Sequence, residues 1–167
     1  MRKATRRAVC LGGAVALLAG CGFQLRQAPN FAFGTLAIAG APNSSIAAEL
    51  RRSIGASGQV QVLPDVQAMQ SQVVLDLLDE RREKVVVGLN ATGQVREFQL
   101  RTRLRFRLRT PQGKELIAPT ELLQQRDISF SESAVLSKEA EENLLYRDMQ
   151  TDLVQQLMRR LAAVRLA

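Results

Sequence analysis

The chain has 167 residues, of which 46% are hydrophobic and 23% are charged, and its formal net charge is +7. It contains no histidine, and both of its cysteines, Cys10 and Cys21, lie close to the N-terminus. Without histidine the chain lacks the most common general base and the most common metal ligand of proteins. We therefore expect a protein that is not an enzyme and that holds neither a metal ion nor a cofactor.

The N-terminus has the order of a secretory signal. Four basic residues at positions 2–7 precede an apolar run over residues 8–19. This run is too short for a transmembrane helix, which needs about 20 apolar residues. We predict that residues 1–20 are a signal peptide, and their removal leaves 19 basic residues against 16 acidic ones.

The end of the apolar run, Leu18-Ala19-Gly20-Cys21, resembles the bacterial lipobox. In that motif the cysteine is acylated and becomes the first residue of the mature protein. The alternative is an ordinary secretory signal whose cleavage falls near a cysteine. We predict that Cys21 carries the lipid, that residues 21–33 form a lipidated tether, and that residues 34–167 form a single domain. Gly22, in place of the aspartate that typically retains such lipoproteins at the inner membrane, favours the outer membrane.

The first part of the domain predicts a strand, a helix and a second strand. Residues 34–39 form a short apolar segment, and Ser44 or Ser45 can cap a helix that continues to about Ala56. The spacing of Ile46, Leu50 and Ile54 places them on one face of this helix. Residues 60–63 predict a brief strand that ends at Pro64.

Three long strands follow. Residues 71–87 read as one edge-like strand with a polar, bulged middle, or as two strand segments. Turn residues at 88–93 precede a strand over about 94–110, and a turn at 111–114 precedes a strand between about 122 and 130. Strands joined by such short turns predict an antiparallel meander.

The last element is a helix that begins at about Ala134 or Lys138 and ends at about Val164. It carries one apolar row at i, i+4 spacing, formed by Leu145, Met149, Leu153, Leu157 and Leu161. The element order predicts an α+β fold in which two helices pack on one face of a mixed, mostly antiparallel sheet.

The strand predicted over about 94–110 contains an arginine at every second position from 101 to 109. These residues, here called the arginine ladder, are Arg101, Arg103, Arg105, Arg107 and Arg109. Side chains alternate across a strand, so the ladder occupies one face and the intervening apolar residues the other. The ladder is either a solvated face paired with cross-strand acids such as Glu121 and Asp127, or a contact surface for an acidic partner. Secretion out of the cytoplasm argues against nucleic acid.

The start of the predicted mature chain, Cys21-Gly22-Phe23-Gln24-Leu25-Arg26, resembles that of the lipopolysaccharide-assembly lipoproteins of the LptE family. Members of this family open with the pattern C-G-aromatic-polar-L-R. Further similarity is found at Gly93-Gln94 with residues 97–100, at residues 134–139, and at residues 155–161.

The resemblance implies a fold of two helices packed on a roughly four-stranded sheet. It also implies a protein on the periplasmic side of the outer membrane that is seated as a plug inside the β-barrel of the lipopolysaccharide translocon, an LptD-like partner. Such a protein supports assembly of the barrel and helps to deliver lipopolysaccharide to the outer leaflet. Family members also bind lipopolysaccharide through basic residues, and Lys138 occupies one such position. A second position falls in the turn at residues 90–92, which has no basic residue here, and Arg96 or the arginine ladder could substitute. The alternative is a stand-alone periplasmic lipoprotein that binds acidic glycolipid or peptidoglycan.

Overall fold

The computed structural model describes residues 29–40, 43–131 and 135–166. The predicted signal peptide and the lipidation of Cys21 lie outside these residues. The elements, in chain order, are β1 (Thr35–Ala39), α2 (Ser45–Ala56), β2 (Gln61–Leu63), the 3-10 helix η1 (Asp65–Gln70), β3 (Val73–Leu89), β4 (Val95–Arg109), β5 (Glu115–Ser129) and α3 (Val135–Ala162).

The strands form one mixed sheet in the order β2-β1-β3-β4-β5. β1 runs parallel to both β2 and β3, and the β3-β4-β5 meander is antiparallel. The α+β prediction is therefore confirmed. The sheet has five strands where we expected about four, because the short segment Gln61–Leu63 pairs with β1.

β3 is a single strand of 17 residues, which settles the choice between one strand and two. β1 pairs only with its first residues, Val73 to Asp76, whereas β4 pairs along its length, so from Leu77 onward β3 is an open edge of the sheet, as the edge-like prediction expected. The predicted bulge is present between Leu77 and Asp79. A bulge inserts one residue and reverses the faces of the residues that follow it.

β5 begins at Glu115, seven residues before the predicted start at about 122. The first part of this strand was not predicted, because Pro119 lies within it and proline is usually confined to sheet edges. β5 is an edge strand of this sheet, so its outer side tolerates a missing backbone donor.

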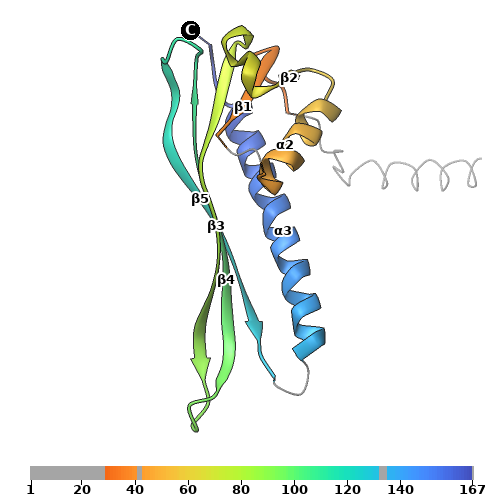
Figure 1. Ribbon diagram of the computed structural model, residues 1–167, viewed down its shortest axis with the longest axis vertical. Coiled ribbons are helices and arrows are strands. Elements are labelled where there is room, and N and C mark those ends of the chain that lie inside the picture. Colours follow the sequence, from red (N-terminus) through yellow and green to blue (C-terminus); the bar gives the residue numbers. More distant parts are fainter. Residues whose placement is uncertain (1–28, 41–42, 132–134, 167) are drawn as a thin grey trace, which may run out of the picture.

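The helices α2 and α3 cover one face of the sheet, which gives two layers (Figure 1). The predicted cap of α2 is confirmed, since the Ser44 hydroxyl accepts a hydrogen bond of 2.9 Å from the Ala47 backbone N–H. Ile46, Leu50 and Ile54 are fully buried in the main core between α2, β1 and the start of β3.

The predicted row of α3 divides between two apolar clusters. Leu153, Leu157 and Leu161 belong to the main core. Met149 joins a smaller cluster with Leu100, Ile128 and Tyr146, against which Leu145 packs. Along the remaining distance between α3 and the sheet, polar and charged side chains fill the interface. They are described below.

The β3-β4 hairpin reaches beyond the other elements, at the end of the molecule opposite β1, β2 and η1 (Figure 1). β5 pairs with β4 only as far as the partners Glu97 and Ser129. Glu97 in turn pairs with Gly88, so beyond that point, over residues 89–95, the hairpin is a two-stranded ribbon. We call residues 89–95 the hairpin tip.

Candidate functional site

The arginine ladder lies on the sheet face opposite the two helices. The alternating residues of β4 that include Leu104, Phe106 and Leu108 are fully buried in the main core. Because side chains alternate along a strand, the arginines point away from this core. The predicted division of this strand into an apolar and a basic face is confirmed.

Acidic residues of the neighbouring strands lie directly opposite the ladder. Arg101 faces Glu83, Arg107 faces Asp76, and Arg109 faces Glu115. Arg105 lies between Asp79 on β3 and Glu121 on β5. The positive charge of the ladder is thus matched across the sheet by carboxylates, as expected for stabilising cross-strand neighbours.

Arg103 has no acid directly opposite and reaches diagonally to two carboxylates. Its Nη1 lies 3.0 Å from Oε1 of Glu121, and its Nε lies 3.6 Å from Oε1 of Glu83. The predicted pairing with Glu121 is confirmed. Asp127 is different, because its carboxylate accepts a hydrogen bond of 2.9 Å from the side-chain amide of Gln99.

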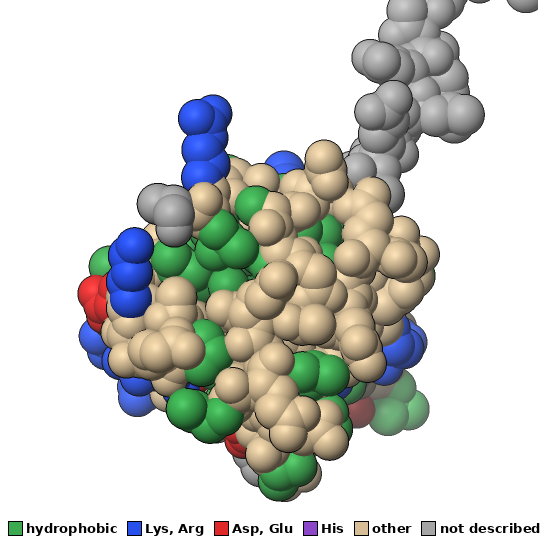
Figure 2. Space-filling view, turned by 90° about the horizontal axis from the view of Figure 1, so that it is seen from above, with side chains coloured by type: hydrophobic (Ala, Val, Ile, Leu, Met, Phe, Trp, Pro, Cys, Tyr) green, Lys and Arg blue, Asp and Glu red, His purple; other side chains and the backbone are tan. Residues whose placement is uncertain are grey.

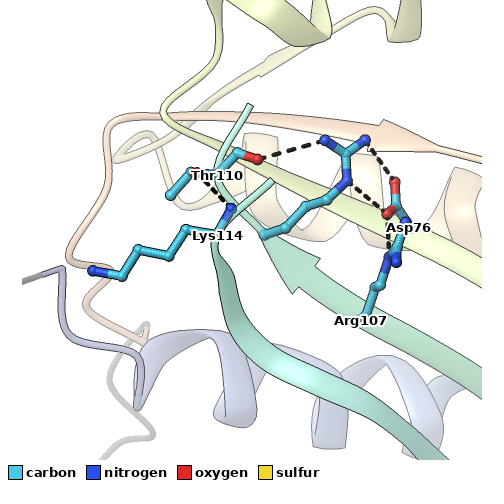
Figure 3. A network of polar contacts seen from close by, with 5 residues as sticks. Asp76, Arg107, Thr110 and Lys114 are labelled. Atoms are coloured by element: carbon cyan, nitrogen blue, oxygen red, sulfur yellow. Dashed lines mark hydrogen bonds and ion pairs between the residues drawn. The ribbon is translucent and has the colours of Figure 1, made fainter. Parts of the chain in front are cut away.

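Arg107 and Arg109 clamp one carboxylate, that of Asp76 (Figure 3). Nε of Arg107 and Nε of Arg109 donate to the same oxygen, Oδ2, at 2.6 and 2.8 Å. Nη2 of Arg109 also donates to Oδ1 at 3.3 Å. Asp76 is only 8% exposed, so these bonds form largely away from water. These two arginines therefore join β4 to β3 and contribute to stability.

The environment of Asp76 shifts its pKa in two opposing ways. Burial alone raises the pKa, because it disfavours the charged carboxylate. The hydrogen bonds from Arg109 and Arg107 and their charges lower it, and the net pKa lies below the ordinary value of 3.8. Asp76 is therefore ionised at neutral pH.

Arg105 is the exposed rung of the ladder. Within the described parts of the chain its guanidinium makes no hydrogen bond and no ion pair. Arg101 is half-buried, and its Nε donates to Oε1 of Gln99 at 2.8 Å. Of the five arginines, Arg105 is thus best placed to meet a partner.

Lys138 lies far from the ladder face, in a small hollow between the first turns of α3 and the distal part of the sheet. We call this the distal hollow, with a volume of ≈ 80 Å³. Its lining comprises Lys84, Phe98, Ile128, Ser129, Phe130, Val135, Lys138, Glu139 and Glu142. Two lysines and an aromatic floor are thus brought together from β3, β4, β5 and α3.

Each lysine of the distal hollow is bound by a glutamate of α3. Nζ of Lys84 lies 2.6 Å from Oε2 of Glu142 and 4.4 Å from the ring centroid of Phe98. Nζ of Lys138 donates to Oε2 of Glu141 at 2.8 Å and to the hydroxyl of Ser129 at 2.9 Å. An incoming anion must therefore compete with carboxylates that already hold both ammonium groups.

Arg96 lies beside the distal hollow. Its backbone carbonyl accepts a hydrogen bond of 2.8 Å from the N–H of Phe130, which lines the hollow. Its side chain is exposed and has no partner among the residues that the structure describes. The fold thus brings Lys138 and Arg96 to one end of the molecule, together with Lys84, which sequence reasoning missed.

Ion pairs and polar contacts also hold the middle of α3 to the sheet. Nη2 of Arg126 lies 2.7 Å from Oδ2 of Asp152. The hydroxyl of Tyr146 donates to the backbone carbonyl of Glu83 at 2.9 Å, and the guanidinium of Arg82 lies 5.3 Å from the Tyr146 ring centroid. The helix is therefore fixed by specific polar contacts where the apolar core is thin.

The end of the molecule opposite the hairpin tip is mostly uncharged (Figure 2). Apolar side chains lie there among polar and backbone atoms, and Lys or Arg side chains are seen mainly around the edge of this view. In η1, Val66 and Met69 are exposed. Across the described residues, no three His, Cys, Asp or Glu side chains gather as a metal site would require, and the helices include none suited to cross a membrane.

Comparison with known proteins identifies the family. The family described as "LptE: Lipopolysaccharide-assembly" matches residues 33–161, which is most of the domain. The chain belongs to the LptE family. No curated protein matches this LptE-family chain.

Solved structures of bacterial lipoproteins share the fold. The solution NMR structure of an uncharacterized lipoprotein B from Nitrosomonas europaea is 34% identical, covers 85% of this chain and 91% of its own, and has a TM-score of 0.74. The crystal structure of rare lipoprotein B from Shewanella oneidensis is 22% identical, with coverages of 78% and 95% and a TM-score of 0.64. A minor lipoprotein from Acinetobacter baumannii is 19% identical, with coverages of 83% and 100% and a TM-score of 0.64. None of these descriptions names a catalytic activity.

Proposed function

We propose that this LptE-family protein is a lipoprotein of the outer membrane that plugs the lipopolysaccharide translocon barrel, supports its assembly and helps to deliver lipopolysaccharide to the outer leaflet. The family match over residues 33–161 carries the proposal. The lipobox-like segment ending at Cys21 supports it, because an acylated cysteine would hold the protein at the membrane.

The charge pattern of the ladder face is compatible with the inside of a barrel. A charge that is buried against a partner without compensation destabilises the complex by several kcal/mol. Four of the five ladder arginines already bond within the sheet, three of them to carboxylates. A polar barrel wall can therefore cover this face without supplying a partner for each arginine, and Arg105 is available for one specific contact.

The basic residues at the distal end suit the phosphate groups of lipopolysaccharide. Ammonium and guanidinium groups form charge-assisted hydrogen bonds with phosphate oxygens. Arg96 is free to make such a contact directly. Lys138 would first have to exchange its bond with Glu141 for a bond with a phosphate oxygen. We therefore propose it as a second contact, at which phosphate competes with the Glu141 carboxylate.

Affinity purification of the tagged full-length protein from outer membranes, followed by mass spectrometry, tests the barrel partnership. We expect a large β-barrel protein to co-purify in stoichiometric amount. Arg105→Gln should weaken that association, whereas the matched variant Arg51→Gln, at an α2 position away from the ladder face, should not. Purification without any barrel would refute the proposal and favour a stand-alone lipoprotein.

A second measurement separates ligand binding from barrel association. The double variant Arg96→Gln, Lys138→Gln should bind lipopolysaccharide less tightly while still co-purifying with the barrel. Unchanged lipopolysaccharide affinity in this variant would exclude the distal residues as the binding site. Loss of both properties together would point to a folding defect, which thermal unfolding of the variant would reveal.

A further inference from the structure

The end of the molecule at which β1 begins carries two strongly exposed apolar side chains. Val66 is 93% exposed and Met69 is 74% exposed, and both belong to η1. Val66 is the most exposed large hydrophobic residue in the described parts of the chain. Single exposed apolar residues are common on protein surfaces, so these two indicate a partner only if their surroundings and their position favour one.

The segment around η1 is nearly uncharged. Among residues 61–72 only Asp65 is charged, although 23% of the whole chain is. The pKa of Arg109 is raised chiefly by its hydrogen bond with Asp76, and the negative charge of Asp65 adds to this shift. The charge of Asp65 is therefore partly balanced by the arginine ladder. The other polar side chains of η1 are glutamines, which carry no charge.

η1 is held to the fold by its backbone, which leaves its apolar side chains outside. It packs against β1. The backbone N–H of Gln67 donates to the carbonyl of Pro64 at 2.9 Å, and the backbone N–H of Ser71 donates to the carbonyl of Ala68 at 3.2 Å. The hydroxyl of Ser71 donates to the same carbonyl at 2.7 Å. Because polar groups with such partners cost less to remove from water, η1 suits a contact with an apolar layer.

The described chain enters the fold beside η1. The backbone N–H of Gly34 donates to the side-chain oxygen of Gln72 at 2.6 Å, and the backbone N–H of Gln72 donates to the hydroxyl of Thr35 at 2.8 Å. Gln72 is the second residue after η1. The lipid predicted on Cys21 is thus attached to the end of the molecule that carries η1 (Figure 1).

The length of the tether sets how far this end can lie from the membrane. Residues 21–28 separate the predicted lipid from the first described residue, and a fully extended chain of that length spans at most about 29 Å. The 15 residues of β4, which run toward the hairpin tip, span about 50 Å. An anchor on Cys21 therefore keeps the η1 end close to the membrane surface, whereas the hairpin end can reach much farther from it.

We propose that η1 lies against the phospholipid surface in which Cys21 is anchored, with Val66 and Met69 in the interfacial region of that leaflet. The proposal rests on the lipidation of Cys21, which is part of the proposed function. A fluid lipid surface accepts a protruding side chain without a matching groove, whereas a protein partner would have to supply a pocket for it.

This contact would add an orientation to the attachment that the lipid provides. A covalent anchor limits the distance between the domain and the membrane, but it does not determine which surface of the domain faces the lipid. Contact strength of this kind increases with the apolar area that enters the interface. The contact is apolar, so it needs neither anionic lipid nor a barrel.

A single engineered thiol tests this contact, because the predicted mature chain contains no cysteine besides Cys21. Met69→Cys carries a nitroxide label in the full-length acylated protein, which is purified from membranes with its co-purifying partners and reconstituted into vesicles of phosphatidylcholine and phosphatidylethanolamine. The matched control is Ala91→Cys, in the exposed turn of the hairpin tip at the opposite end. Wild-type protein treated with the label gives the background.

Two paramagnetic reagents report where each label lies. Oxygen concentrates in lipid, and the nickel chelate NiEDDA concentrates in water. We expect the label at residue 69 to be more accessible to oxygen than to NiEDDA, and the label at residue 91 to show the reverse. Adding Val66→Asp to Met69→Cys should abolish the preference for oxygen, whereas adding Ala91→Asp, the same charge at the opposite end, should not. Thermal unfolding should be unchanged by Val66→Asp, since Val66 is exposed.

Three results would overturn the proposal. NiEDDA accessibility at residue 69 as high as that at residue 91 would mean that η1 faces water. Low accessibility of residue 69 to both reagents would mean that protein, such as a barrel wall, covers it. A preference for oxygen that survives Val66→Asp would mean that the label itself enters the lipid.

Flotation of the unlabelled protein with the vesicles distinguishes failure of this proposal from failure of the proposed function. Protein that does not float has no lipid anchor, which would refute both the lipoprotein function and the contact of η1. Protein that floats while residue 69 remains in water would refute the contact of η1 alone.

Discussion

Replacement of Asp76 by asparagine tests whether the ladder arginines act in the fold. Asp76→Asn keeps the size of the side chain but removes its negative charge and replaces one acceptor oxygen by an NH2 group, which cannot accept a hydrogen bond. Arg107 and Arg109 then lose the carboxylate that separates their two positive charges. We expect the variant to fold with reduced stability.

The expected loss follows from the geometry of the clamp. A hydrogen bond to a charged group contributes about 1.5–3 kcal/mol, and three bonds join the two arginines to Asp76. The side chains of Arg107 and Arg109 are 38% and 25% exposed, so water replaces part of what they lose. We therefore expect a decrease of about 2 kcal/mol in the free energy of unfolding, or about 4–8 °C in Tm.

Urea denaturation followed by circular dichroism measures this free energy. Asp127→Asn is the matched control, because Asp127 is exposed and its one partner among the described residues is the uncharged amide of Gln99. We expect the control to change stability by less than about 0.5 kcal/mol. If Asp76→Asn lost no more than the control, the ladder would be dispensable for folding and its arginines would be free to serve a partner.

Three further predictions concern stability. The pKa of Asp76 in the folded protein lies below its ordinary value of 3.8, so the contribution of its charge to the free energy of unfolding is fully present above pH 3.8 and disappears as the pH falls through the folded pKa. The free energies of unfolding of wild type and Asp76→Asn, measured at decreasing pH, should therefore converge below pH 3.8. Thr102→Val should raise the free energy of unfolding by about 1 kcal/mol in urea denaturation, because the buried Thr102 hydroxyl has no hydrogen-bond partner among the described residues; a destabilised variant would mean that this hydroxyl is bonded, for instance to water. Gly40→Ala should lower Tm well beyond Gly113→Ala, since both glycines have positive φ but only at Gly40 would a Cβ meet backbone, 2.7 Å from the Leu77 carbonyl oxygen; equal effects would contradict this.

The alternation of β4 was predictable, but the acids that neutralise its arginines were not. Strict alternation along β3 would put Asp76 and Asp79 on opposite faces of the sheet. The bulge between Leu77 and Asp79 brings both to the ladder face, opposite Arg107 and Arg105. A sequence that suggests a bulge does not fix its position, so the pairing of charges across the sheet depended on a register that only the structure supplies.

The distal hollow could be predicted only in part, because its residues also come together through the strand register. Lys138 came from resemblance to the family, and no local pattern linked it to Lys84, which is more than 50 residues away along the chain. The same bulge sets the face of Lys84, and the antiparallel register with β4 places it over Phe98. The amphipathic helices were predicted well, because their i, i+4 patterns require no knowledge of distant segments.

The unequal division of the apolar core implies that the molecule does not open as one unit. The C-terminal half of α3 is fixed by the main core, whereas its N-terminal half is held by a small cluster and by the ion pair of Glu142 with Lys84. Regions with few buried apolar contacts open at lower free energy than the core. Within α3, amide hydrogen exchange should therefore be fastest in the first turns, and it should accelerate further as salt weakens the ion pair there.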